Sequence, residues 1–338
     1  MPEIRKDPVT GNCVIIATER SKRPHDFTRP YELKRSENCV FCYGNEDKTP
    51  PEVLAWRPQG GESNSPGWTV RAFPNKFPAV TPDGDPVPFE AGISQVMAAV
   101  GAHEVVVDSP DHFGSLGRVS DEQAEQVLLA LAERYKTLSQ DSRVKYIQVF
   151  KNSGATAGAS LEHTHWQIIT VPVMPAAFLA EFAGAKQHQE LNGTCIYCKI
   201  AADEIAGMER IVEITDEFVV CSPYASRFPF ELWILPRKHE ADFGCLNKSD
   251  LKSLGCLVRR TVRRLERAFN YPPYNLVVHT GPPEKGFDIF HWHIEILPRL
   301  SITAGFEWGT GIFINPTSPE MAAVTLREID PDVRQDES

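Results

Sequence analysis

Short runs of β-branched and apolar residues, separated by Pro, Gly and Asn, recur along the chain and predict β-strands. They lie at residues 105–107, 147–150, 166–169, 232–235, 276–278 and 294–297. Two longer segments, 120–138 and 249–269, instead repeat apolar residues at helical spacing and open with Ser-Asp, which predicts capped amphipathic helices. Because consecutive strands occur without a helix between each pair, the pattern favours an α+β fold over a doubly wound α/β fold.

The chain carries the same pattern of residues twice. In each copy a C-x-x-C pair is followed by a single histidine and then, 51 positions later in the first copy and 52 in the second, by a His-x-His sequence. Two further matches extend the repeat. Glu104 and Glu231 each stand eight positions before the single histidine, and Tyr146 and Tyr274 each stand 17 positions before the His-x-His sequence.

The chain length agrees with two structural units, since 338 residues exceed what one hydrophobic core usually holds. We therefore predict two halves of one architecture, residues 1–175 and 176–338. Each half is expected to be a mostly antiparallel sheet with a covering helix. A stretch rich in Pro and Ala near Pro175 joins the two halves.

Composition and charge narrow the classes of partner. The hydrophobic fraction of 42% and the charged fraction of 24% are ordinary for a globular protein. The net charge of −10 argues against a nucleic-acid partner, which would need a basic face, but leaves room for a pocket that binds a small phosphate. No apolar run is as long as a membrane span, and the first residues lack an apolar signal region. We therefore expect a cytoplasmic protein without a membrane partner.

Four of the eight cysteines form the two C-x-x-C pairs. Disulfides are disfavoured in the cytoplasm, where such pairs more often bind metal or carry out redox chemistry. Two histidines at matching positions complete a Cys₂His₂ ligand set for tetrahedral zinc in each half. The first predicted set is Cys39, Cys42, His112 and His163, and the second is Cys195, Cys198, His239 and His291. We predict two structural zinc sites; iron at one site and redox-active C-x-x-C motifs are the alternatives.

The segment His-Thr-His-Trp-Gln at 163–167 carries the candidate catalytic residues. In a strand, His163, His165 and Gln167 share one face, so a metal bound to His163 would hold His165 rigidly beside it. A neutral imidazole is a competent nucleophile toward phosphorus, which makes His165 the predicted nucleophile. The amide of Gln167 can donate to a phosphate oxygen and stabilise charge in the transition state.

A loop rich in small residues precedes this segment. Residues 152–160, which include Asn152, Gly154 and Ser160, read Asn-Ser-Gly-Ala-Thr-Ala-Gly-Ala-Ser. Backbone N–H groups in such a loop can approach a phosphate closely. Taken alone, His-x-His is more often a metal pair and a Gly/Ala segment is usually only a loop, but their adjacency favours a catalytic site.

The sequence His163-Thr-His165-Trp-Gln167 resembles the His-x-His-x-Gln signature of the galactose-1-phosphate uridylyltransferase branch of the histidine-triad superfamily. The resemblance covers nearly the whole chain and includes residues 6–11, 20–24, 40–42, 73–78, 109–112 and 150–154. It implies two tandem histidine-triad-like halves and a ping-pong reaction in which His165 becomes nucleotidylated. In that family, UDP-glucose leaves a uridylyl group on the histidine and galactose 1-phosphate collects it.

The resemblance also implies roles for further residues. Gln167 would hold the phosphoryl group. The positions that match nucleotide-, phosphate- or hexose-binding residues are Asn75, Asn152, Ser160 and Glu307. Arg20 and Arg23 match arginines that reach the sugar phosphate from the partner subunit, which implies a homodimer. The implied ligands are a nucleotide sugar and either a sugar 1-phosphate or phosphate.

Two segments depart from the uridylyltransferase pattern. Residues 301–307 lack the lysine of the family's hexose-binding motif and carry Phe306 in place of a tyrosine. Residues 306–316 and 151–160 resemble the ADP-glucose phosphorylases, which pass an adenylyl group to inorganic phosphate. The prediction is therefore a hexose-1-phosphate uridylyltransferase with an ADP-glucose phosphorylase as the alternative. Two other hypotheses are a hydrolase, which usually carries a further histidine where Gln167 stands, and a zinc-stabilised binding protein.

His293 is the spare histidine of the second copy. One hypothesis makes it a second nucleophile. The favoured hypothesis makes it a remnant of the repeat that packs beneath the sheet, because Glu295 replaces the glutamine and residues 281–284 lack the loop of small residues.

Overall fold

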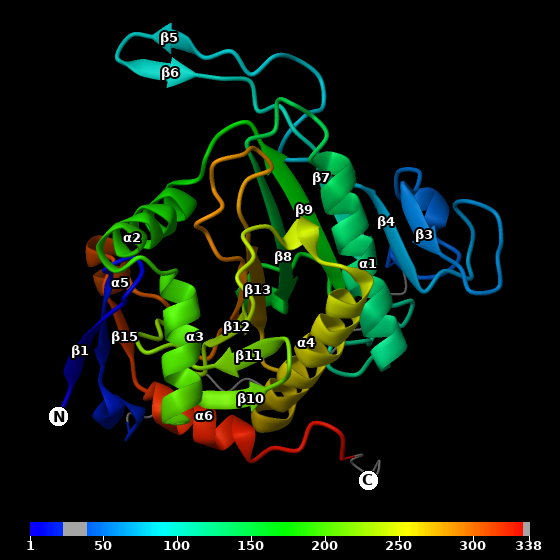
Figure 1. Cartoon of the computed structure of the whole chain (residues 1–338). Helices are drawn as coiled ribbons and strands as arrows, with labels where there is room; N and C mark the ends of the chain where they lie inside the picture. Colours follow the sequence, from blue (N-terminus) through cyan, green and yellow to red (C-terminus); the bar gives the residue numbers. More distant parts are fainter. Residues whose placement is uncertain (23–38, 334–338) are drawn as a thin grey trace.

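An antiparallel sheet of ten strands forms the centre of the computed structural model, which describes residues 1–22 and 39–333 (Figure 1). The strands follow the order β10-β11-β12-β14-β13-β8-β9-β7-β4-β3 across the sheet. Their bounds are β3 (Leu54–Trp56), β4 (Val70–Pro74), β7 (His103–Val107), β8 (Tyr146–Ser153), β9 (His165–Val171), β10 (Ile211–Ile214), β11 (Phe218–Cys221), β12 (Leu232–Pro236), β13 (Tyr274–His279) and β14 (His293–Pro298). All six predicted strand segments lie within these strands, and the predicted α+β class is confirmed.

The sheet consists of two halves with the same strand order. Strands β3-β4-β7-β9-β8 form one half, and β10-β11-β12-β14-β13 repeat the order in the other. The halves meet where β8 pairs antiparallel with β13, so that Phe150 lies opposite Val277. Two equivalent strands that pair in this way relate the halves by an approximate two-fold axis. The repeat read from the sequence is therefore a structural repeat, while the boundary at residue 175 stays a prediction.

The structure corrects the residue-by-residue matching within the repeat. Glu104 accepts a hydrogen bond from Arg134, which belongs to the helix α1 (Asp121–Leu138) on one face of the sheet. Glu231 accepts a hydrogen bond from Arg227 on the other face. Tyr274 belongs to the main core, whereas Tyr146 packs with Phe178 and Phe290 on the opposite face. Both matches were one residue out of register. Because side chains alternate along a strand, a shift of one residue moves a side chain to the other face.

Two long helices cover one face of the sheet (Figure 1). Helices α1 (Asp121–Leu138) and α4 (Lys248–Phe269) lie side by side and share the main hydrophobic core with residues such as Trp166 and Trp292. Both helices were predicted. The cap of α4 is Asn247 rather than Ser249, because the Asn247 side chain accepts hydrogen bonds from two backbone N–H groups of the first turn.

The other face of the second half is covered by helices that the periodicity did not predict. Helices α2 (Ala176–Asn192) and α3 (Ile196–Gly207) follow the Pro/Ala stretch, and Tyr197 and Ala201 of α3 pack on Trp233 and Leu235. On the same face of the first half, Phe41 packs on β4 and β7. Two short helices, α5 (Gly305–Thr310) and α6 (Pro319–Arg327), and the 3₁₀ helices η1 (Thr18–Lys22), η2 (Glu46–Lys48), η3 (Ala155–Ala157) and η4 (Phe243–Cys245) complete the helical elements of the described residues.

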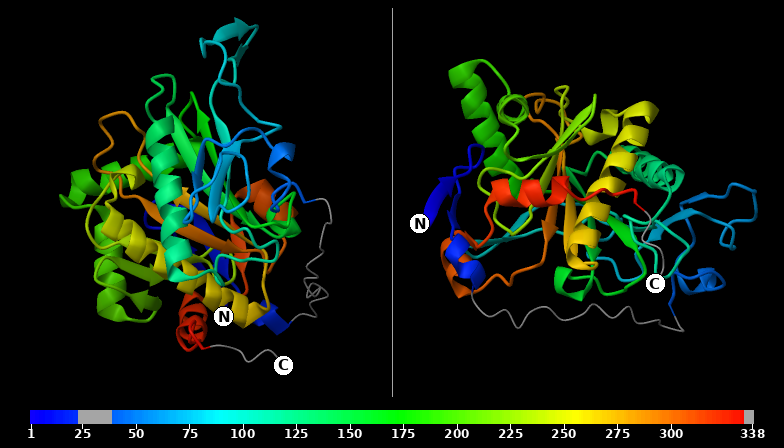
Figure 2. Two further views of the ribbon diagram at one scale, coloured as in Figure 1. Left: turned by 90° about the vertical axis from the view of Figure 1, so that its right-hand side faces the viewer. Right: turned by 90° about the horizontal axis from the view of Figure 1, so that it is seen from below.

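Two smaller sheets lie outside the central one. Strand β2 (Cys13–Ile16) pairs with β1 (Glu3–Lys6) on one side and with β15 (Phe313–Asn315) on the other, so the beginning of the chain packs with its C-terminal part. Strands β5 (Phe89–Ala91) and β6 (Ser94–Val96) form a hairpin that projects from the body of the molecule (Figure 2). None of the helices in the described part of the chain combines the length and apolarity that a membrane span needs.

Candidate active site and metal centres

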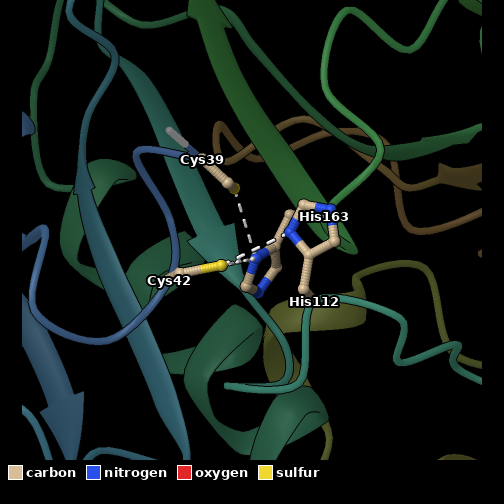
Figure 3. Close-up of side chains that lie close together, drawn as sticks. All are labelled: Cys39, Cys42, His112 and His163. Atoms are coloured by element: carbon tan, nitrogen blue, oxygen red, sulfur yellow. Dashed lines mark hydrogen bonds between the residues drawn. The ribbon is translucent and has the colours of Figure 1, made fainter. Parts of the chain in front are cut away.

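The four residues of the first predicted metal set lie together between β4, β7 and the start of β9. Their sulfur and imidazole nitrogen atoms point toward one another (Figure 3). The Sγ atom of Cys42 lies 3.3 Å from Nδ1 of His112 and 3.5 Å from Nδ1 of His163, and Sγ of Cys39 lies 3.5 Å from the same His163 atom. This arrangement could hold one metal ion.

The second predicted set repeats this geometry in the other half. Cys195 Sγ lies 3.6 Å from His291 Nδ1, and Cys198 Sγ lies 3.5 Å from the same atom and 3.7 Å from His239 Nδ1. Cys195 lies at the N-cap position of α3, and His291 precedes β14 as His163 precedes β9. This set could also hold a metal ion.

Hydrogen bonds to carbonyl groups orient three of the four imidazoles in these sets. Nε2 of His163 lies 2.7 Å from the carbonyl oxygen of Ser109, and Nε2 of His291 lies 3.0 Å from that of Pro236. His239 makes the same type of bond to a backbone carbonyl at 2.8 Å. Because a carbonyl only accepts, each Nε2 carries the proton and each Nδ1 directs a lone pair at the cluster, as metal ligands require.

His165, the predicted nucleophile, is the first residue of β9. Its Nδ1 lies 2.8 Å from the carbonyl oxygen of His163, so Nδ1–H donates and Nε2 keeps its lone pair. Burial lowers the pKa of His165 to about 4, because only 5% of the residue is exposed. The ring is therefore neutral near pH 7. The ring of Phe41 meets it edge-on, with 5.3 Å between the ring centroids.

Gln167 lies on the same face of β9 and contacts a histidine that the sequence analysis missed. Oε1 of Gln167 is 2.8 Å from Nε2 of His103, at the start of β7. Nδ2 of Asn75, predicted to bind nucleotide, is 3.1 Å from the same His103 nitrogen. His103 alternates with Val105 and Val107 toward this face, but the sequence does not show that β7 pairs with β9.

The loop of small residues after β8 turns sharply next to the other half of the sheet. Gly154 has a φ of +82°, and a Cβ there would lie 2.9 Å from Pro273 Cβ, so only glycine fits without strain. Asn152 accepts a hydrogen bond of 2.7 Å from Asn275 of β13. Ser160 is exposed, and within the described residues no hydrogen bond joins it to His165.

Arg20, Arg23 and Glu307 are the other residues predicted to bind substrate. Arg20 is exposed in η1, and Arg23 lies outside the described residues. Glu307 is in α5, where its carboxylate accepts a hydrogen bond from the backbone of Ala304 at 3.0 Å. Among residues 1–22 and 39–333, no hydrogen bond or ion pair connects Arg20 or Glu307 with His165.

A buried lysine, also missed, supports the strand of the predicted nucleophile from the opposite face. Lys151 Nζ lies 2.7 Å from a carboxylate oxygen of Asp108 and donates to the Thr164 hydroxyl at 2.6 Å and the His165 carbonyl at 3.2 Å. Trp166 Nε1 donates to the same Asp108 oxygen at 3.0 Å. This network ties the beginning of β9 to β8 and to the segment after β7.

The second half places different residues at the positions of the candidate active site. Phe150 of β8 pairs with Gln167 of β9, and Val277 of β13 pairs with Glu295 of β14 in the same way. These equivalent pairs align the residues of the two halves. The second half has His293 at the position of His165 and Glu295 at the position of Gln167. It has His279 at the position of Asn152 and Glu231 at the position of His103.

These residues form a buried charged network. His279 lies 3.0 Å from Glu181 of α2 and 3.2 Å from Glu295, which also pairs with Arg227 at 2.5 Å. Burial opposes a charge on His279, but the two carboxylates outweigh it and raise the pKa of this imidazole to about 10. His293 stacks on His279 and is 1% exposed. The ligand atoms of Glu181, His279 and His293 also lie close enough together to hold a metal ion.

Comparison with known proteins places the chain among nucleotidyltransferases. Residues 1–175 match the family described as galactose-1-phosphate uridyl transferase, N-terminal domain, and residues 95–330 match a domain of unknown function (DUF4921). The chain is 34% identical to the ADP-glucose phosphorylase of Arabidopsis thaliana over 97% of this chain and 93% of that protein. It is 29% identical to the galactose-1-phosphate uridylyltransferase of Thermotoga maritima over 98% and 100% of the two chains.

Solved structures resemble the fold over its full length. The crystal structure of an ADP-glucose phosphorylase from Arabidopsis thaliana with bound ADP-glucose superimposes with a TM-score of 0.82 and 33% identity, covering 98% of this chain and 100% of that one. A uridylyltransferase structure gives a TM-score of 0.75 and 27% identity, with 97% of each chain covered.

Proposed function

The chain belongs to the galactose-1-phosphate uridyl transferase family, and from that premise we propose that it transfers a nucleotidyl group by way of a covalent intermediate on His165. One observation carries the proposal: the His163 carbonyl fixes the proton of His165 on Nδ1 and leaves a lone pair on Nε2, on the face that carries Gln167. A neutral, oriented imidazole of this kind is suited to attack phosphorus.

The proposed reaction has two displacements. In the first, Nε2 of His165 attacks the α-phosphorus of a nucleotide sugar, the N–P bond forms, and the bond to the departing sugar 1-phosphate breaks. The His163 carbonyl, which accepts from Nδ1–H, stabilises the positive charge that develops on the ring. In the second, an oxygen of an acceptor phosphate attacks the same phosphorus, the N–P bond breaks, and the imidazole is regenerated. An amide N–H of Gln167 stabilises the charge on a phosphoryl oxygen in both steps.

We propose zinc as the metal at both Cys₂His₂ sets. A tetrahedral zinc with Zn–S of about 2.3 Å and Zn–N of about 2.0–2.1 Å has an S···N edge of about 3.6 Å. The S···N distances of 3.3–3.7 Å in the two sets agree with that edge. With four protein ligands each, the centres would be structural, and His163 would connect one centre to the strand of His165. Thiolate ligands persist in a reducing compartment, so we propose a cytoplasmic location.

We propose ADP-glucose as the donor and inorganic phosphate as the acceptor, ahead of the UDP-glucose and galactose 1-phosphate pair favoured by the sequence signature. The Arabidopsis ADP-glucose phosphorylase supports this order, with 34% identity against 29% for the Thermotoga uridylyltransferase. The absence of a lysine in residues 301–307 supports it as well. The uridylyl pair remains the second candidate because the His-x-His-x-Gln signature is that of the uridylyltransferases.

We also propose a homodimer in which Arg20 and Arg23 of one subunit reach the substrate of the other. The exposure of Arg20, and the lack of any bond between it and His165 within the described chain, support a role across a subunit interface. Light scattering of the purified protein would test the stoichiometry, and a monomer at micromolar concentration that is fully active would contradict the proposal.

The test of the function is the intact mass of the protein after separate incubation with ADP-glucose and with UDP-glucose, without acceptor. We expect an adenylyl increment that phosphate discharges. A uridylyl increment that galactose 1-phosphate discharges would select the second candidate. His165→Asn should abolish the increment, whereas His188→Asn, at a histidine of α2, should retain it. No increment with either donor would refute the covalent mechanism.

A further inference from the structure

A chain of hydrogen bonds runs from the backbone at Ala79 through His103 to Gln167. The backbone N–H of Ala79 points to Nδ1 of His103 at 3.2 Å. A backbone N–H can only donate, so Nδ1 must accept and carries no proton. The ring is then neutral, and its single proton is on Nε2.

The proton on Nε2 determines the orientation of the Gln167 amide. Nε2 of His103 lies 2.8 Å from Oε1 of Gln167, which accepts the hydrogen bond. If the amide were rotated by half a turn, two N–H groups would face each other. The oxygen is therefore directed at His103 and the NH₂ group away from it. Within the described residues no protein acceptor is found for this NH₂ group.

Asn75 is oriented in the same sense by a second backbone group. Its Oδ1 accepts from the backbone N–H of Phe77 at 2.9 Å, so its NH₂ group lies on the side of His103, 3.1 Å from Nε2. Both of these nitrogens carry hydrogen, so the contact is not a hydrogen bond. Two side-chain amides thus have their oxygens held by the protein and keep N–H donors for an external acceptor, such as a phosphate oxygen.

The second half shows that the fold does not require this arrangement. Val106 pairs with Trp166 as Ile234 pairs with Ile294, and three positions earlier His103 is matched by Glu231. The position of Gln167 is taken by Glu295, and Arg227 bridges the two carboxylates. At the equivalent backbone positions, the second half therefore carries carboxylates, which accept hydrogen bonds, in place of His103 and the Gln167 amide, which can donate them.

We propose that His103 is a positioning residue: it fixes the Gln167 amide with its N–H groups available to the phosphoryl group during nucleotidyl transfer. The proposal rests on the proposed function of the His165 site. Without the His103 donor, the amide can rotate and place its oxygen against a phosphate oxygen, where the two lone pairs repel. A preorganised donor stabilises developing charge without reorganisation at the moment of reaction.

Two substitutions that resemble histidine in shape each retain a different one of the two hydrogen bonds of His103. In His103→Asn, the amide oxygen can accept from Ala79 in place of Nδ1, but no donor reaches Gln167. In His103→Gln, the amide nitrogen reaches the place of Nε2 and can donate to Gln167. For His103→Asn we expect kcat to fall about tenfold with the donor KM within about twofold, because a net hydrogen bond of this kind is worth roughly that factor. His103→Gln should stay within about threefold of the unaltered protein.

A third variant tests whether His103 acts through Gln167. Gln167→Met retains the shape but has no amide to orient, so adding His103→Asn to it should change kcat by no more than about twofold. Equal losses for His103→Asn and His103→Gln would overturn the proposal. So would a tenfold loss from His103→Asn in the Gln167→Met background.

A readout independent of turnover is the tautomer of His103. In protein labelled with ¹⁵N-histidine, the imidazole signals assigned to His103 by their loss in His103→Asn should show Nε2 protonated and Nδ1 bare. A proton on Nδ1 would overturn the proposal whatever the activity. Failure of the unaltered protein to form any nucleotidyl adduct would instead refute the proposed function, and the tautomer would still decide the hydrogen-bond chain.

Discussion

Glu266 of α4 offers a test of the electrostatics in the packing between the two halves. Only 4% of the residue is exposed, and its Oε2 has no hydrogen-bond partner in the described structure. Burial raises the pKa of Glu266 from 4.5 to about 7, although Ser115, Arg263 and Arg118 act in the opposite direction. The guanidinium of Arg263 lies 3.8 Å from Oε2 of Glu266. The folded protein therefore favours the protonated carboxyl.

The raised pKa makes the free energy of unfolding depend on pH. Below pH 4.5 the carboxyl of Glu266 is protonated in both the folded and the unfolded state, so it imposes no penalty. Between pH 4.5 and 7 the unfolded chain loses the proton first, and the stability of the fold decreases. The difference of about 2.5 pH units, at about 1.4 kcal/mol per unit, gives a penalty of roughly 3–4 kcal/mol well above pH 7.

Replacing Glu266 with Gln should remove that penalty, because the amide has nearly the same shape and no charge. We expect Glu266→Gln to unfold at higher urea concentration than the unaltered protein at pH 8, by about 1–3 kcal/mol in unfolding free energy, and to match it near pH 5. Glu133→Gln, on the exposed surface of α1, controls for the change in net charge and should show no such difference. If Glu266→Gln is less stable by the same amount at both pH values, the carboxylate is paired as an anion and the reasoning is wrong.

Three further substitutions test other features of the structure. Lys151→Met should lower the unfolding free energy by about 3–5 kcal/mol in urea titrations, because it leaves Asp108 buried without its cation; a loss below about 1 kcal/mol would contradict the buried ion pair. Cys39→Ser should reduce the zinc measured by plasma mass spectrometry from two ions to one per chain, and unchanged zinc content would exclude the first centre. Gly184→Ala should destabilise the packing of the N-terminal strands on α2 by about 1–3 kcal/mol, because its Cβ would lie 1.8 Å from the carbonyl oxygen of Val9. Unaltered protection of the β1 and β2 amides in hydrogen exchange would contradict this.

Much of the local structure could be predicted because its causes are local. Short runs of β-branched and apolar residues located strands such as β9 and β14, and the cap of α1 lies at Ser120 as the Ser-Asp signal indicated. Both metal sets were found from the type and spacing of Cys and His alone, and the structure brings all members of each set together. Helices α2 and α3 were missed because their apolar residues do not form a clear stripe along one side.

The matching of the two halves shows where spacing along the chain misleads. Equal distances aligned Glu104 with Glu231 and Tyr146 with Tyr274, yet each pair faces opposite sides of the sheet. The loops that connect the strands differ in length by one residue between the halves. A count along the chain includes those loops, whereas the face of a side chain depends only on the position within the strand.

The sequence by itself therefore determined the repeat, the fold class, the two metal sets and the strand that carries His165 and Gln167. These features depend on residue types and on periodicities over a few neighbouring positions. The tertiary structure alone decided which strands are neighbours, and with them the contact of His103 with Gln167 and the network of Glu181 with His279 and Glu295. Such contacts join residues far apart in the chain through side-chain hydrogen bonds, which leave no periodic trace in the sequence and form only when packing fixes the register of the strands.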